Sequence, residues 1–162
     1  MKKVYVYILV ITIVAIFSCK EEAKKDLVFD EKKGLKVEVT NSAGDKWNST
    51  DKFLPLPFNV ARGKTEDIIV LSERLEKGKS IDVKPIGAIR ILQNDTLLTY
   101  IVSLPVDKKQ RSITADDFDE FSTVYSGAKW IVEQYMLNRK NSPSVKLKSW
   151  ENENFAIKYL LK

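Results

Sequence analysis

Residues 78–105, GKSIDVKPIGAIRILQNDTLLTYIVSLP, carry the clearest pattern in this 162-residue sequence. Apolar and polar residues alternate over Ser80–Val83 and again over Ala88–Leu92, which is the period of a half-buried strand. Gln93–Thr96 predicts a turn, and Leu97–Ser103 returns as an apolar strand rich in β-branched residues. A three-stranded meander of this kind can form the wall of a small barrel, with the other elements packed around it.

The segments on either side of the meander predict further strands and two helices. Strands are expected at Leu27–Phe29, Leu35–Val39, Ile68–Leu71 and Val145–Lys148. A helix is predicted from an N-cap at Thr114, with Asp117 as the acid of a capping box, to about Arg139. A short C-terminal helix is expected to begin at Trp150. The pattern therefore predicts a small β-barrel flanked by a long helix and a C-terminal helix.

Composition narrows the classes of function. With 44% hydrophobic and 30% charged residues, the chain has the make-up of one ordinary domain with a core. Its net charge of +5 comes from cations scattered among acids, so no nucleic-acid surface is indicated. The sequence has no histidine, which excludes Ser-His-Asp and Cys-His catalysis and histidine zinc sites. Mg²⁺ held by carboxylates is the metal chemistry that remains.

The first residues have the organisation of a bacterial lipoprotein signal. Two lysines precede the apolar run Val4–Phe17, which is shorter than the roughly 20 residues of a membrane span. Cys19 stands where cleavage would occur, as in the lipobox of bacterial lipoproteins. We expect a signal peptide over 1–18, a membrane-anchoring lipid on Cys19, a charged tether over 19–34 and a location in the bacterial cell envelope. The alternative is an ordinary signal peptide or a short anchor helix with an incidental cysteine.

Four segments, by their order and spacing, resemble the soluble family I inorganic pyrophosphatases. Lys36–Glu38 matches that family's Lys-x-Glu strand, and residues 53–59, FLPLPFN, stand where it has Phe-Tyr-Pro-x-Asn-Tyr-Gly. Residues 78–105 match its meander without a gap, and residues 145–152, VKLKSWEN, match its Gly-Trp-Glu-Asn-like ending. The resemblance covers residues 35–162 as one domain. It implies an α+β fold, an OB-like small five-stranded β-barrel with a long flanking helix and a C-terminal helix.

The resemblance implies Mg²⁺-dependent hydrolysis of diphosphate to two phosphates. In that family several Mg²⁺ ions, held by carboxylates, activate a water while Lys, Arg and Tyr side chains position the substrate. Carried over, it makes Asp67 the catalytic base and a metal ligand, and Glu38 a second metal ligand. The positions implied for pyrophosphate or another small anion are Lys36, Lys46, Arg62, Lys64 and Tyr135. The family forms dimers and hexamers, which implies a homo-oligomer.

Most of the family's metal-binding carboxylates are replaced in this chain. The signature Asp-Gly-Asp-Pro-x-Asp falls on residues 62–67, RGKTED, so Arg62 and Lys64 stand for its first two acids. At the tip of the meander, Gln93 and Leu98 also stand where the family has acids. Because cations next to a divalent ion repel it, a full Mg²⁺ cluster is not expected. Hydrolysis is therefore expected to be weak or lost.

Two classes of function stay open, an enzyme and a non-catalytic envelope lipoprotein. In the second class, the cations would bind a phosphate-like or other anionic ligand without metal. Each residue also has a structural alternative. Lys36 and Glu38 can form a solvated pair, Arg62 and Lys64 can be surface loop charges, and Tyr135 can belong to the core. The basic balance can also reflect contact with an anionic surface close to the lipid anchor.

Overall fold

The structure is a computed structural model that describes residues 29–30, 32–47, 54–63, 66–139 and 145–162. Cys19, the predicted signal peptide, Lys64 and the first two residues of the expected strand at 27–29 lie outside these residues, and Phe29 itself is not in a strand. Among the described helices, none combines the length and apolar character needed to cross a membrane.

The described elements alternate strands with short helices. The strands are β1 (Leu35–Asn41), β2 (Asn59–Arg62), β3 (Asp67–Val70), β4 (Ser80–Gln93), β5 (Thr96–Pro105) and β6 (Val145–Asn152). The helices are the 3-10 helix η1 (Lys108–Gln110), α1 (Phe118–Thr123), α2 (Ser126–Asn138) and α3 (Glu153–Leu160). All of them lie between residues 35 and 160, so a protein of residues 20–162 contains the whole described fold.

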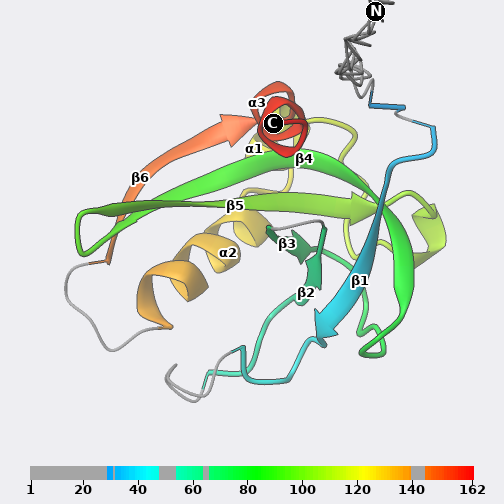
Figure 1. The fold of residues 1–162 in the computed structure, drawn as a ribbon, viewed down its shortest axis with the longest axis horizontal. Helices are drawn as coiled ribbons and strands as arrows, with labels where there is room; N and C mark the ends of the chain where they lie inside the picture. The colour runs from blue at the N-terminus through cyan, green and yellow to red at the C-terminus, as the bar shows by residue number, and fades with distance from the viewer. Residues whose placement is uncertain (1–28, 31, 48–53, 64–65, 140–144) are drawn as a thin grey trace, which may run out of the picture.

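Five strands close into a ring in the order β1-β2-β3-β5-β4, because β1 also pairs with β4 (Figure 1). β6 pairs with residues 87–93 of β4, beyond residues 80–83 that pair with β1, and β3–β5 is the parallel pair among otherwise antiparallel neighbours. Inward-facing apolar residues come from every strand of the ring, namely Val37, Val39, Ala61, Ile68, Val70, Ile81, Val83, Ala88 and Ile101. The ring and its flanking helices confirm the predicted α+β, OB-like five-stranded architecture.

The meander differs from its prediction in one respect. Instead of two strands separated by a break, β4 is a single strand of 14 residues with a register shift between Pro85 and Gly87. Such an irregularity tolerates a proline, which has no N–H to donate. At Gly87 a Cβ would meet the Phe118 ring at 2.7 Å and the Glu151 carbonyl oxygen at 2.9 Å, so only glycine fits where α1 and β6 approach β4.

The long helix predicted to end near Arg139 is two helices. α1 begins after Asp117, whose carboxylate accepts the backbone N–H of Glu120 at 2.8 Å, so Asp117 and not Thr114 is the N-cap. Tyr125 then leaves the helical conformation before α2 starts, with φ −105° and ψ 31°. The hydroxyls of Thr114 and Tyr125 hydrogen-bond to each other at 2.6 Å. This hydrogen bond engages the Thr114 hydroxyl and holds Tyr125 at the break between α1 and α2.

The C-terminal strand is longer than predicted. β6 continues through Trp150 to Asn152, and α3 starts only there, with the Asn152 side chain accepting the N–H of Phe155 at 3.1 Å. The Trp150 indole donates to the Glu133 carboxylate of α2 at 2.9 Å. Trp150 therefore ties the strand to the helix that covers the outer face of the ring.

Asn59 joins three separate segments from a fully buried position at the start of β2. Its Oδ1 accepts the backbone N–H groups of Ala43 and Leu75 at 2.9 and 3.0 Å. Its Nδ2 donates to the Ser72 hydroxyl at 2.9 Å and to the Glu73 carbonyl at 2.8 Å. One side chain thus fixes the loop after β1 and the loop after β3 against β2.

Candidate functional site

Three charged residues form a row across neighbouring strands on the outer face of the ring. Glu38 of β1 lies opposite Arg62 of β2, and Arg62 lies opposite Asp67 of β3. Their neighbours in sequence, Val37 and Ile68 among them, point into the ring. Because side chains alternate along a strand, the three charged side chains point outward.

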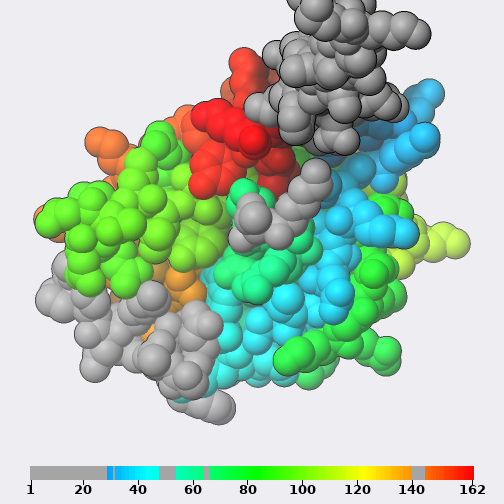
Figure 2. All heavy atoms as spheres, viewed as in Figure 1, coloured from blue at the N-terminus to red at the C-terminus, as the bar shows by residue number. Residues whose placement is uncertain are grey.

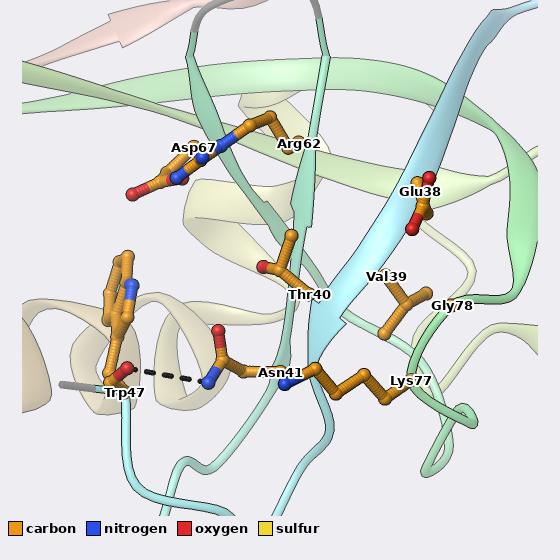
Figure 3. A pocket seen from close by; sticks show the side chains of 9 residues that line it. All are labelled: Glu38, Val39, Thr40, Asn41, Trp47, Arg62, Asp67, Lys77 and Gly78. Atoms are coloured by element: carbon orange, nitrogen blue, oxygen red, sulfur yellow. Dashed lines mark hydrogen bonds and ion pairs between the residues drawn. The ribbon is translucent and has the colours of Figure 1, made fainter.

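The row forms one wall of a groove of about 430 Å³ (Figure 3). The groove is lined by Glu38, Arg62 and Asp67 from the strands, by Asn41 and Trp47 from the end of β1 and the loop after it, and by Lys77 from the turn before β4. A second hollow of about 260 Å³ shares Arg62 and Asp67 with the groove and is lined also by Glu66, Leu98, Tyr100 and Tyr159. Among the described residues that line the two hollows, the carboxylates are Glu38, Glu66 and Asp67 and the cations are Arg62 and Lys77.

Arg62 and Asp67 are joined by an ion pair at the centre of this surface. Nη2 and Nε of Arg62 donate to the same oxygen, Oδ1 of Asp67, at 3.0 and 3.3 Å. The Arg62 side chain is 59% exposed and that of Asp67 is 29% exposed. The guanidinium thus occupies the carboxylate that the family resemblance makes a base and metal ligand.

Trp47 is held at the lower end of the groove by two polar side chains. The Asn41 amide donates to the Trp47 and Lys46 carbonyls at 3.3 and 3.2 Å. Behind the indole lies Arg139, which is only 2% exposed, with its guanidinium carbon 4.1 Å from the ring centroid. Arg139 also donates to the Tyr100 hydroxyl at 2.8 Å. A buried cation–π contact therefore supports the wall that the groove presents to solvent.

The sequence-predicted site residues are only partly brought together. Glu38, Arg62 and Asp67 meet in the groove, as described above. Lys36 is exposed on β1 opposite Asp82 of β4, and neither Lys36 nor Lys46 lines the groove. Tyr135 is 7% exposed within the core, with its ring centroid 5.2 Å from that of Phe58. Lys64 lies outside the described residues.

Sequence reasoning did not find Lys77 and Arg139. Lys77 reaches the groove because the turn before β4 is bonded to β1, Gly78 donating to the Val39 carbonyl at 2.8 Å and Val39 donating to that of Lys79 at 2.9 Å. No local sequence pattern predicts this long-range contact. Arg139 follows the last residue of α2, and a cation is common there because it interacts favourably with the C-terminal end of the helix dipole. Its position in the sequence therefore did not indicate a role at the groove.

The described residues do not fit the Mg²⁺ cluster that the resemblance implies. Within the described part of the chain, no three Asp, Glu, Cys or His residues are grouped so that they could hold a metal ion. Of the two candidate ligands, Asp67 is bound by Arg62, and Arg62 also lies between Asp67 and Glu38 in the strand register. A cation in the middle of the row repels a divalent ion at each position where the carboxylates could share one.

Comparisons with known proteins bear on the fold. No protein-family model matches the sequence, and a search of curated proteins finds no match. Among solved structures, the inorganic pyrophosphatase of Helicobacter pylori is similar, with a TM-score of 0.64 and 20% identity over 82% of this chain and 91% of that one. Those of Neisseria gonorrhoeae and Thermus thermophilus both give a TM-score of 0.65 and 15% identity over 81% of this chain, and 90% and 95% of theirs. At these identities the likeness shows that the chain has the pyrophosphatase fold.

Proposed function

We propose that this chain is a non-hydrolytic protein of the pyrophosphatase fold that binds a phosphate-bearing anion through side-chain cations. The ion pair between Arg62 and Asp67 is the observation that carries the proposal. The Arg62 guanidinium, 3.0 Å from Oδ1 of Asp67, occupies this carboxylate and repels a divalent ion that would bind to it. The row of carboxylates that hydrolysis needs is thereby interrupted at its centre.

The geometry of the same pair favours an anionic ligand. Both donors of Arg62 converge on one oxygen of Asp67, whereas a guanidinium binds best to two oxygens side by side. A phosphate group offers such a pair of oxygens. The exposed Arg62 side chain can release Asp67 and bind the two phosphate oxygens instead. Lys77, from the opposite side of the groove, supplies a second cation.

Pyrophosphate tests both parts of the proposal with a protein of residues 20–162. With excess Mg²⁺ we expect no phosphate release above a control without protein. In Mg²⁺-free buffer, titration calorimetry is expected to detect pyrophosphate binding that Arg62→Met weakens at least about tenfold, because it removes a charge-assisted contact. Arg74→Met is the matched control, since Arg74 pairs with Asp45 at 3.1 Å and does not line the groove.

The two parts of the proposal, the absence of hydrolysis and the binding of an anion, are tested independently. Phosphate release that a chelator abolishes would show that a reduced set of carboxylates suffices for hydrolysis. A folded protein that does not bind pyrophosphate, or equal losses in Arg62→Met and Arg74→Met, would contradict anion binding at this groove.

We also propose that the protein is held in the bacterial cell envelope by a lipid on Cys19. The proposal is supported by the order of the two lysines, the short apolar run and the cysteine in the sequence. Cells fed an alkyne-labelled fatty acid are expected to label the wild-type band and not the Cys19→Ser band. A Cys19→Ser protein that is labelled as strongly as the wild type would rule out this attachment point.

A further inference from the structure

We propose that five lysines at the place where the chain enters the fold form a surface that binds anionic phospholipid bilayers. This entry surface consists of Lys32, Lys33, Lys79, Lys108 and Lys109, all of them exposed. None of these five lysines lines the groove, whose one lysine among the described residues is Lys77.

Four of these lysines are presented by two turns of the same construction. The Asp30 carboxylate accepts the backbone N–H of Lys32 at 3.0 Å, and the Asp107 carboxylate accepts that of Lys109 at 3.0 Å. In each turn an aspartate binds the backbone two residues further on. Each aspartate is thus engaged by its own turn, while the lysine pair that follows it remains exposed.

A glycine brings the two turns together. Gly34 has φ +68°, and a Cβ there would lie 2.6 Å from a Val106 methyl carbon and 2.7 Å from the Val83 carbonyl oxygen. Only glycine lets the first turn pack this closely on the segment leading to η1. Figures 1 and 2 show the blue segment after residue 31 and yellow-green η1 on the same side of the molecule.

Lys79 extends the entry surface beside the second turn. It lines a hollow of about 350 Å³ together with Asp82, Val106, Asp107 and Gln110. Against the five lysines stand three described acids, Asp30, Asp82 and Asp107. Asp30 lies 3.9 Å from the Lys33 ammonium, the outer limit of an ion pair. The entry surface therefore carries a net positive charge of two among the described residues.

The position of the entry surface indicates a bilayer as its partner. Phe29, the first described residue, is ten residues from Cys19, a span of at most about 35 Å when extended. If the lipid proposed above is present, it keeps these lysines close to the headgroups. Each lysine near an anionic bilayer adds about 1 kcal/mol of attraction, so a group of lysines acts together where single ones do little.

The test uses residues 20–162, which lack Cys19, and vesicles of phosphatidylcholine alone or with about one third phosphatidylglycerol. In co-sedimentation we expect binding to the anionic vesicles only, weakening as salt is added. Reversing one lysine pair (Lys32→Glu with Lys33→Glu, or Lys108→Glu with Lys109→Glu) is expected to weaken binding at least about tenfold. The control reverses Lys146 and Lys148, two exposed lysines of β6, and is expected to stay within about twofold of wild type.

The control separates a surface from a general charge effect, because all three double variants lower the net charge by the same amount. Equal losses in all three would overturn the proposal, as would a folded wild-type protein that ignores anionic vesicles. Thermal melts by circular dichroism check that the variants fold. Because substitutions at exposed positions shift the free energy of unfolding by only about 0.5 kcal/mol, we expect melting temperatures close to that of the wild type. Because the tested protein lacks Cys19, none of these outcomes depends on the lipid proposed above.

Discussion

Arg62→Asp is expected to create a divalent-cation site in the groove. The new carboxylate would stand between Glu38 and Asp67 on three adjacent strands, where opposite residues lie about 5 Å apart. Three carboxylates at this spacing resemble the weaker oxygen sites that bind Ca²⁺ with dissociation constants of about 1 mM, and we expect the same order of magnitude for Mg²⁺. In 10 mM MgCl₂ a site of that affinity would stabilise the variant by about 1.4 kcal/mol, and the wild type by nothing measurable.

Calorimetric titration with Mg²⁺ and melting temperatures with and without the ion measure this effect. Without metal we expect Arg62→Asp to be less stable than wild type, because its three carboxylates repel one another. Arg74→Asp serves as the control, since it removes a comparable surface pair with Asp45 outside the groove. If Mg²⁺ stabilises Arg62→Asp no more than Arg74→Asp, the central cation is not what keeps metal from this row.

Asn59→Ala is expected to lower the free energy of unfolding by about 3 kcal/mol or more. Its removal would leave the buried N–H of Leu75 without its acceptor, at a cost of about 1–3 kcal/mol, and would remove the acceptor of the partly buried N–H of Ala43 as well. The Ser72 hydroxyl would also lose the amide that donates to it, and the Glu73 carbonyl would keep only the Ser72 hydroxyl as a side-chain donor. The melting temperature should fall by about 10 °C, measured by circular dichroism with urea unfolding for the free energy.

The same variant should disturb the groove, because Ala43 and Trp47 both lie in the loop that follows β1. Tryptophan fluorescence is therefore expected to change in the folded variant. Asn154→Ala, at an exposed position of α3, is the control and should change stability by less than about 0.5 kcal/mol. A loss below about 1 kcal/mol in Asn59→Ala would mean that water replaces the amide and that the three segments are held by other contacts.

The sequence predicted four of the five ring strands, β1, β3, β4 and β5, from alternating or continuous apolar runs rich in β-branched residues. Leu35–Val39 and Leu97–Ser103 were found within a few residues of β1 and β5. β2 was missed, since its four residues follow directly on a proline-rich segment and are too short for a pattern. The helix break at Tyr125 was missed because a hydroxyl contact with Thr114, eleven residues away, decides it.

The candidate site was predictable only where it lies on strands. The family resemblance placed Glu38, Arg62 and Asp67 in one site, and the register of β1, β2 and β3 brings them to one face of the ring. Lys77 and Arg139 reach the site or its wall through contacts between distant segments, and no spacing in the sequence encodes those contacts. Cations that reach a site through contacts between distant segments can be identified only from the three-dimensional structure.

The closure of the ring has a consequence for the speed of folding. Leu35 pairs with Val83 and Gly87 with Asn152, so most of the chain must be available before the sheet is complete. Loop-closure entropy is lost before such distant pairings are gained, and proteins dominated by distant strand pairings fold in milliseconds to seconds rather than microseconds.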